Sequence, residues 1–269
     1  MFICGLGISF LYLAATAFFG IGFMNGRDSM FRLGGVAAYS SIPLHLGYLI
    51  MVGIRNKTIP LASFYQAMSV VSLFIALTYV IIRVSVHSKS VGFFVFPFVF
   101  TFHVIATFGP RIIYLGESFI SSPLFWFHTL ATLLGYAAFG FAMILSVMYL
   151  PLFREIKQNR PSRMYDRLPP LELLDRLNTM ALVAGFVFLT VGMILGGALA
   201  VSVWKRIPFT DAKILASLVL WAVYLFGLLM LAVRKWRGRK LSLLSIIGFI
   251  VVIVGVVVAR LFDSSFHRF

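Results

Sequence analysis

Charged side chains are scarce in this chain: Asp, Glu, Lys and Arg make up 12% of its 269 residues, and only 8 residues are acidic. Globular domains are about half apolar and about a quarter charged, whereas this chain is 61% apolar with a mean hydropathy of +1.01. A soluble core cannot bury that much apolar surface, so a soluble globular protein is excluded. The composition predicts an all-α integral membrane protein.

Cysteine is nearly absent too, since Cys4 is the only one in the chain. One cysteine allows no intrachain disulfide and no zinc cluster, and without a CxxCH motif a heme would not be attached through thioethers. The net charge of +15 would suggest nucleic acid in a soluble protein. Here the cations lie in the loops between apolar runs, where they set membrane orientation, so nucleic-acid binding is excluded.

Long apolar runs are what the chain has in abundance. A membrane-spanning helix needs roughly 20 apolar residues, and such runs occur at residues 2–24, 34–53, 64–86, 91–109, 126–152, 179–203, 212–233 and 241–262. The first run lacks a basic segment before it, so we interpret it as a retained helix rather than a cleaved signal. With no internal repeat and no low-complexity linker, residues 1–269 are predicted to form one multi-pass domain of about eight transmembrane helices.

The distribution of Lys and Arg predicts the orientation of these helices. Fifteen of the 23 cations lie in loops after odd-numbered spans, and positively charged loops stay in the cytoplasm. Both termini are therefore expected on the external face of a bacterial plasma membrane, with loops 154–178 and 234–240 inside. The first of these loops is basic and carries an amphipathic turn after Pro169 and Pro170, which predicts a short helix on the cytoplasmic interface.

Four of the five histidines gather toward the external face. His128 lies at the outer end of the fifth span, His267 just beyond the eighth, and His45 and His103 in the middle or outer half of the second and fourth. An imidazole inside a bilayer is costly unless it faces a partner or a cavity, so these residues are candidates for function.

Neutral imidazoles bind iron, zinc and copper well. Catalytic zinc needs further ligands close by, and the outer face offers Glu117, Asp211 and Asp263 at no recognisable spacing. A bis-imidazole heme needs only two histidines across a flat, aromatic-lined slot. His128 and His267, beside a loop that contains a tryptophan, match that requirement.

Simpler explanations stay open for each residue. His128 is equally consistent with an interfacial histidine bonded to backbone or water, and His267 with a polar tail. His45 is consistent with a bond to a neighbouring helix, and the sequence assigns no role to His103.

The polar break at residues 200–221 concentrates Trp204, three cations and Asp211 in residues 204–213. Cations toward this face are candidates to pair with heme propionates through charge-assisted hydrogen bonds; they are Arg55, Lys57, Arg111, Lys205 and Arg206.

In this break the chain resembles the cytochrome c assembly family of membrane heme-handling proteins, the CcsA and HemX type, and the likeness runs from about residue 40 to the end. The family's outer loop reads roughly WGxxWxWDPK and leads into a helix with WxxY. Trp204, Asp211 and Lys213 stand at its first Trp, its Asp and its Lys. Pro208 and Thr210 replace its second and third Trp.

Two further loop positions depart from the motif, since Lys205 replaces its Gly and Ala212 its Pro. Other positions support the resemblance: Trp221 and Tyr224 in WxxY, His128, Gly135 and Tyr136 in a pattern like WLxxHVxxxxxGYAxF, and His267 in one like LxSxxHxY. The LPPLELLD stretch and the inner loop at Gly238, Arg239 and Lys240 resemble the HemX-like branch, here with a degenerate Trp-rich loop.

The resemblance implies that His128 and His267 are the axial ligands of a non-covalently bound heme b, held under the loop from Trp204 to Asp211. It makes His45 the candidate ligand on an inward route. The implied function is binding and delivery of heme at the outer face for c-type cytochrome biogenesis, with a membrane partner of the maturation system and apocytochrome c as a further candidate partner.

Enzymatic activity stays open, at most as a component of a cytochrome c synthase that adds peptide thiols to heme vinyl groups. One alternative is a membrane regulator or scaffold for heme biosynthesis enzymes that acts through the cytoplasmic loops. Another is a small-solute permease, which needs polar groups along a central path; beyond the histidines the spans offer few.

Overall fold

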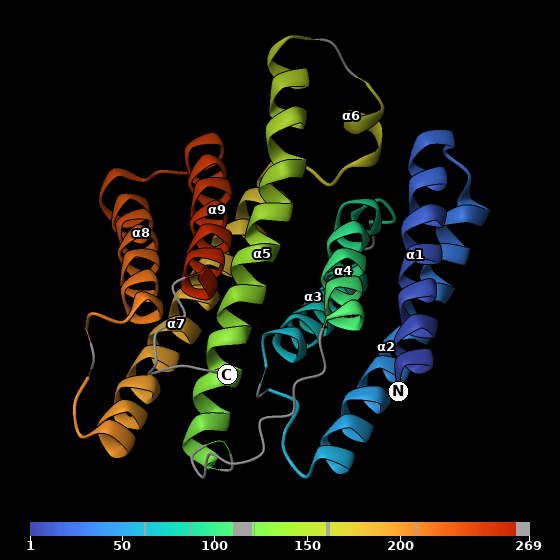
Figure 1. Cartoon of the computed structure of the whole chain (residues 1–269). Coiled ribbons are helices and arrows are strands. Elements are labelled where there is room, and N and C mark those ends of the chain that lie inside the picture. The colour runs from blue at the N-terminus through green and yellow to red at the C-terminus, as the bar shows by residue number, and fades with distance from the viewer. Residues whose placement is uncertain are drawn as a thin grey trace. The chain divides into compact units, whose positions relative to one another are not determined.

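The computed structural model describes residues 1–61, 63–86, 88–109, 120, 122–159, 162–207 and 209–261. The helices of this described part are α1 (Phe2–Asn25), α2 (Asp28–Asn56), α3 (Phe64–Val86), α4 (Val91–Phe108), α5 (Pro123–Lys157), α6 (Arg163–Arg167), α7 (Leu171–Trp204), α8 (Ala212–Arg234) and α9 (Arg239–Leu261) (Figure 1). All but α6 are long and apolar enough to cross a membrane. The described residues contain no strand, so the predicted all-α multi-pass fold class is confirmed.

Several helices extend beyond the apolar runs that predicted them. α2 begins at Asp28, α5 continues to Lys157 and α7 begins at Leu171. Charged terminal turns satisfy their backbone hydrogen bonds as well as apolar ones do, so hydropathy locates a span better than it locates the ends of its helix. The amphipathic turn after Pro170 is accordingly the start of α7, and the separate short helix of this loop is α6.

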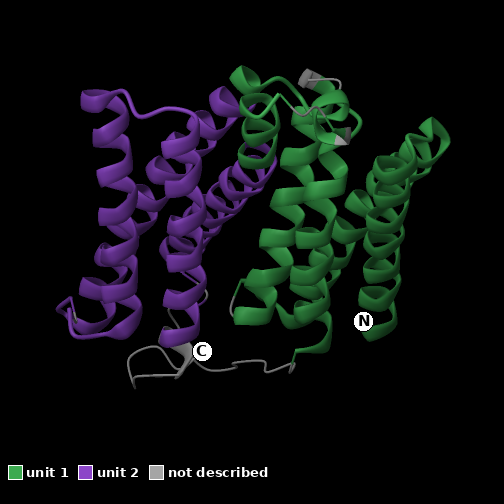
Figure 2. Ribbon diagram, turned by 90° about the horizontal axis from the view of Figure 1, so that it is seen from above, with its two compact units in different colours: residues 1–113, 150–173 green, residues 114–149, 174–269 purple. Residues whose placement is uncertain are grey.

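The chain divides into two compact units (Figure 2). Unit 1 comprises residues 1–113 and 150–173, and unit 2 comprises residues 114–149 and 174–269. The long helices α5 and α7 contribute residues to both units.

Unit 1 is built from α1 to α4. α1 packs against α2 and α4, and α3 packs against α2 and α4, so the four helices close a ring of neighbours. The Phe19 ring stacks on Phe96 with centroids 5.4 Å apart. Gly92 leaves room for that ring, because a Cβ there would lie 2.7 Å from it.

Unit 2 is built from α5, α7, α8 and α9. The Phe139 ring of α5 stacks on the Tyr224 ring of α8 with centroids 3.6 Å apart and an interplanar angle of 1°. α8 also packs against α9. Ser245 of α9 donates a buried hydrogen bond of 2.9 Å to the Asn178 side-chain oxygen of α7, which satisfies two polar groups inside the unit.

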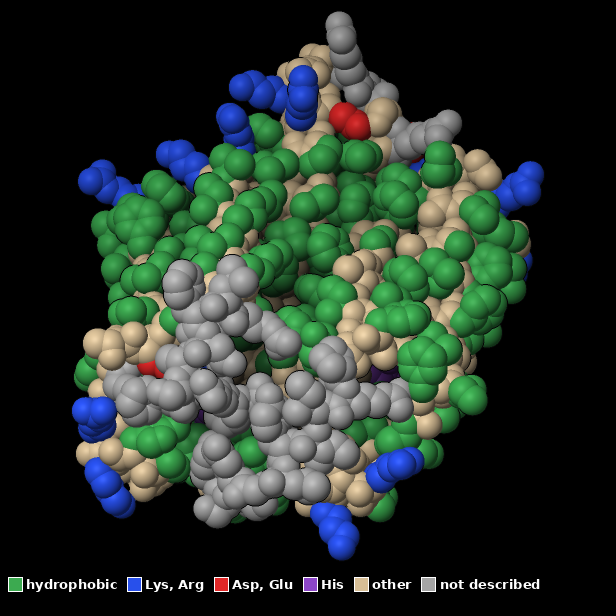
Figure 3. Space-filling model, viewed as in Figure 1, with side chains coloured by type: hydrophobic (Ala, Val, Ile, Leu, Met, Phe, Trp, Pro, Cys, Tyr) green, Lys and Arg blue, Asp and Glu red, His purple; other side chains and the backbone are tan. Residues whose placement is uncertain are grey.

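The outer surface of the helices suits a lipid environment. On the face shown in Figure 3, hydrophobic side chains cover the helix bodies, and Lys and Arg side chains stand at the margins. Large apolar side chains are exposed on these helices, as at Ile54 and Val233. Water would oppose such exposure, whereas lipid chains do not.

An acidic side chain ties the start of α7 to the loop between α8 and α9. Asp175 accepts a 2.7 Å hydrogen bond from the Gly238 backbone N–H and lies 3.8 Å from the Arg237 guanidinium. Gly238 has a φ of 58°, a left-handed conformation that glycine adopts without strain. Asp175 therefore holds the loop between α8 and α9 at Gly238, the residue at which the chain turns.

We expect Asp175→Ala to destabilise unit 2 by roughly 1–3 kcal/mol, since a half-buried backbone donor loses its charged acceptor. Thermal unfolding in detergent measures the effect as a lower midpoint. Glu172→Ala is the control, because the Glu172 carboxylate is exposed in the same first turns of α7. Equal midpoints for the two variants would show that the Asp175 bond contributes nothing.

Candidate functional site

Unit 2 brings three predicted site residues into one region. His128 of α5 and Trp204 at the end of α7 both line a cavity of about 230 Å³, and Asp211 opens α8 two residues before Lys213, which also lines it. Most of the other lining is apolar or aromatic, from Phe125, Met193, Leu199, Ala200, Ile207, Phe209, Ile214 and Leu218. This lining suits one edge of a flat hydrophobic ligand that carries a negative group.

The imidazole of His128 is held in one orientation. Its Nδ1–H donates a 2.7 Å hydrogen bond to the Gly192 carbonyl oxygen of α7. A carbonyl can only accept, so the proton lies on Nδ1 and the lone pair on Nε2. A histidine whose other ring nitrogen donates to a carbonyl is the usual arrangement of a metal-ligating imidazole.

Glycines along one face of α7 give α5 its position. A Cβ at Gly192 would lie 3.1 Å from the backbone nitrogen of Thr132, and one at Gly196 would lie 2.6 Å from Cε1 of His128. A Cβ at Gly185 would lie 2.5 Å from the Phe139 ring. Small residues allow this close approach inside a membrane. The space over Gly196 is the space that the His128 ring occupies.

The break between α7 and α8 turns at Lys205. This residue has a φ of 59° directly after Trp204, and its N–H bonds back to Val201. A glycine would adopt this conformation freely, which explains why the family pattern has Gly where this chain has Lys205. The turn leaves Trp204 and Phe209 on the cavity wall.

Asp211 has a structural role in this loop. Its side chain accepts a 2.8 Å hydrogen bond from the Lys213 N–H and caps the start of α8. The residue is 2% exposed. Capping by Asp satisfies an otherwise unpaired backbone donor, and here it fixes the helix turn that carries Lys213.

Sequence reasoning left two polar residues out of the site. Lys213 and Ser217 lie one turn apart on α8 and line the cavity with His128. The spacing of four residues on a helix was the available signal. The Ser217 hydroxyl donates to the backbone carbonyl of Lys213 at 2.8 Å. Among the described lining residues, Lys213 is the one with a cationic side chain.

The aromatic residues of the WxxY pattern hold α8 in place. The Trp221 indole donates a 3.0 Å hydrogen bond to the Thr190 hydroxyl of α7, and Tyr224 stacks on Phe139. Gly135, the glycine before Tyr136, lets α5 pack closely on α7, because a Cβ at this position would lie only 3.1 Å from the backbone nitrogen of Leu189. These positions build the walls of unit 2 rather than its cavity.

His45 lies in unit 1, in a different environment from His128. Its Nδ1 is 2.9 Å from the Tyr12 hydroxyl, and its Nε2 is 2.8 Å from the Ser69 hydroxyl. Its ring meets the His103 ring edge-on at 4.5 Å between centroids, and both rings are 0% exposed. The structure thus pairs two histidines that the sequence did not connect.

The other ring of this pair has its own partners. His103 Nδ1 lies 3.0 Å from the Ser9 hydroxyl and 3.3 Å from the Thr107 hydroxyl. Its Nε2 has no partner within the described part of the chain.

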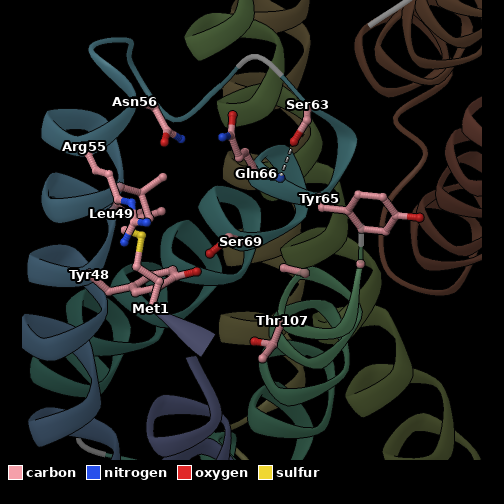
Figure 4. A pocket seen from close by; sticks show the side chains of 13 residues that line it. Met1, Tyr48, Leu49, Arg55, Asn56, Ser63, Tyr65, Gln66, Ser69 and Thr107 are labelled. Carbon is pink, nitrogen blue, oxygen red and sulfur yellow. Dashed lines mark hydrogen bonds between the residues drawn. The ribbon is translucent and has the colours of Figure 1, made fainter. Parts of the chain in front are cut away.

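Arg55, proposed above as a propionate partner, lies in unit 1. It lines a second cavity, of about 210 Å³, together with Ser69 and Thr107, which bond to His45 and His103 (Figure 4). Arg55 and His45 therefore belong to one region, and His128 and Trp204 to another.

Two predicted site residues, Arg111 and His267, lie outside the described residues. Within the described ranges no group of three or more His, Cys, Asp and Glu side chains is placed to hold a metal ion.

Comparison with known proteins gives a consistent result. The family model described as cytochrome C assembly protein matches residues 35–267. A cytochrome c biogenesis protein CcsA of Chlamydomonas reinhardtii is 24% identical over 260 residues, which cover 87% of this chain and 72% of that protein.

Cyanobacterial relatives match over a shorter stretch. The CcsA protein of Prochlorococcus marinus strain NATL1A is 36% identical over 98 residues, or 36% of this chain and 31% of that protein. The CcsA protein of Thermosynechococcus vestitus is 34% identical over 103 residues, or 38% of this chain and 32% of that protein. The match spans about a third of the length of these relatives.

The capping role of Asp211 predicts a difference between two substitutions. Asp211→Ala should destabilise the start of α8 by about 1 kcal/mol, whereas Asp211→Asn keeps a capping oxygen and should be nearly neutral. Thermal unfolding in detergent compares them. If both variants lose the same stability, the negative charge rather than the cap is what matters.

Proposed function

The chain belongs to the cytochrome c assembly protein family, and from this premise we propose that it binds heme b non-covalently in unit 2 and delivers it at the outer face of the membrane. Membership in the family implies heme handling in the maturation of c-type cytochromes. The heme is the cargo in this proposal, and the protein supplies its ligands and walls.

The observation that carries the proposal is the orientation of His128. Nδ1 donates to Gly192, and His128 lines a cavity with aromatic and apolar walls. In the proposal, the other ring nitrogen, Nε2, is the atom that ligates the iron. Imidazole nitrogen is a common axial ligand of heme iron. The residues present therefore fit a heme edge.

Other residues of the cavity would contact the heme ring and its propionates. Trp204 and Phe209 supply flat apolar surface against the macrocycle. The Lys213 ammonium is placed to pair with a propionate by a charge-assisted hydrogen bond. In the proposal, His267 is the second axial ligand and Arg111 a further propionate partner.

His45 is not part of the proposed heme site. Both of its ring nitrogens are hydrogen-bonded, so ligation of iron through either nitrogen would break a buried bond. Each buried polar group left unpaired costs about 1–3 kcal/mol. The Tyr12 and Ser69 bonds thus favour a structural role for this imidazole.

We do not extend the proposal to covalent ligation of heme. The second and third tryptophans of the family loop are Pro208 and Thr210 here, so stacking surface is lost where a synthase would hold heme for attack by thiols. Delivery to a membrane partner of the maturation system needs less of that surface, and apocytochrome c is a further candidate partner.

An alternative is that the protein regulates or scaffolds heme biosynthesis enzymes from the cytoplasm, as in the HemX-like branch. The observation that favours it is a hollow between α8 and α9 whose described lining includes Arg234, Lys235, Arg237, Arg239 and Lys240. Such a cluster attracts acidic partners. The two functions differ in one readout, because a regulator would keep its activity when His128 is replaced.

We expect His128→Ala to remove or shift the Soret band of the heme-loaded protein, and His267→Ala to do the same. Gly196→Ala should weaken heme binding roughly 10- to 100-fold by displacing the His128 ring. Gly47→Ala on α2 is the control, since Gly47 lines no part of this cavity and no heavy atom of the described residues outside its own helix lies within 4 Å of the added Cβ. Absorption titration with heme measures all four variants, and unchanged spectra in both histidine variants would sink the assignment.

The side of the membrane on which heme is delivered can be tested, because the distribution of Lys and Arg predicts that the unit 2 cavity lies on the external side. In a Cys4→Ser background, a cysteine at the exposed Phe209 should react with a membrane-impermeant maleimide in intact cells. A cysteine at the exposed Arg239 should react only after the cells are opened. The reverse pattern would place the unit 2 cavity on the cytoplasmic side and contradict external delivery.

A further inference from the structure

Unit 1 contains a cavity that the proposed function does not use. It measures about 210 Å³ and lies among α2, α3 and α4 (Figure 4). We propose that this cavity binds the headgroup of a lipid-soluble quinone, in both its oxidised and its reduced form. This inference is independent of the heme site in unit 2.

The size of the cavity suits a small ring system. A cavity of about 150 Å³ is enough to hold benzene, so about 210 Å³ accepts a headgroup of one or two rings. Tyr48 and Tyr65 supply aromatic lining, against which a planar ring can stack.

The polar groups are arranged in two layers. Figure 4 shows the amides of Asn56 and Gln66 on facing sides at one end of the space, with the hydroxyls of Tyr48 and Ser69 close together further in. The described lining therefore offers hydrogen-bonding groups at both ends. A quinone has carbonyl oxygens at opposite ends of its ring and requires that distribution.

The inner layer consists of groups that both donate and accept. The hydroxyls of Ser69 and Tyr48 line the cavity, and a hydroxyl can donate to a quinone carbonyl or accept from a quinol O–H. The Thr107 hydroxyl donates to the His103 carbonyl at 2.8 Å, so it can accept from a quinol O–H. Amide N–H or guanidinium groups alone would bind only the oxidised form. The inner end is thus suited to both redox states.

Two buried imidazoles stand directly behind this layer. Ser69 lies 2.8 Å from His45 Nε2, and Thr107 lies 3.3 Å from His103 Nδ1. A neutral imidazole can accept a proton at one ring nitrogen and donate one from the other. The hydroxyls of the cavity therefore connect a bound ring to groups that can exchange protons, as a quinone–quinol pair requires.

The charge distribution argues against an anionic ligand in the inner part. Arg55 carries the only fully charged side chain in the described lining, and that side chain is exposed. A carboxylate bound only by neutral hydroxyls inside a membrane would pay a large desolvation penalty. A neutral carbonyl bound in the same place would not.

The experiment is photoaffinity labelling of the purified full-length protein in nanodiscs with an azido-1,4-naphthoquinone. Labelled peptides are identified by mass spectrometry, and affinity is measured by competition with menadione. We expect label on the peptides that carry Tyr48 and Gln66, and loss of that label with excess menadione but not with laurate or heme.

Substitutions in the inner layer give the second arm. Ser69→Ala should weaken the apparent affinity for menadione roughly tenfold, the effect of one lost hydrogen bond. Thr107→Val should weaken the apparent affinity for the reduced form, menadiol, by a similar factor, because the Thr107 hydroxyl can accept from its O–H. Ser72→Ala is the control on α3, because Ser72 is buried one turn from Ser69 but donates to the Val99 carbonyl. Thr101→Val is the control on α4, where Thr101 donates to Pro97.

Three results would overturn the proposal. They are absence of label from the cavity peptides, displacement of the label by laurate or heme as effective as by menadione, and equal affinity losses in the inner-layer variants and their controls. Size-exclusion profiles of each variant verify folding, and the Ser69 and Thr107 substitutions lie on different helices, so a folding defect in one leaves the other to decide.

Discussion

The close approach of α5 to α7 is the constraint on which the unit 2 site depends. Within a bilayer the hydrophobic effect does not drive helices together, so contact relies on small residues and interhelical hydrogen bonds. Here Gly192 and Gly196 supply both. Gly196 leaves space for the His128 ring, and the Gly192 carbonyl fixes its tautomer. A larger residue at either position would move the imidazole away from the cavity wall that it shares with Trp204.

The two histidine environments show two ways to satisfy an imidazole in a membrane. His45 bonds through both ring nitrogens and is fully buried beside His103. His128 bonds to the neighbouring helix through Nδ1 and lines a cavity. In the first arrangement the imidazole is part of a buried hydroxyl network, whereas in the second it lies at the wall of a cavity. The sequence alone treated these residues as similar candidates.

The sequence predicted the fold well because hydropathy directly reports which segments must lie in lipid. It missed the ends of α2, α5 and α7, since the charged turns from Asp28 and to Lys157 remain helical outside the apolar run. It also missed the pairing of His45 with His103, which depends on how α2 and α4 rotate about their axes. The role of Lys213 was readable from its helical spacing to Ser217, but only after the cavity was known.

The central claim is that this protein binds heme through His128. The most direct test is the absorption spectrum of the detergent-purified protein, oxidised and dithionite-reduced, with a pyridine hemochrome assay for stoichiometry. The heme proposal predicts a b-type spectrum with about one heme per chain, either as purified or after addition of heme. A colourless protein that also fails to take up added heme would contradict it.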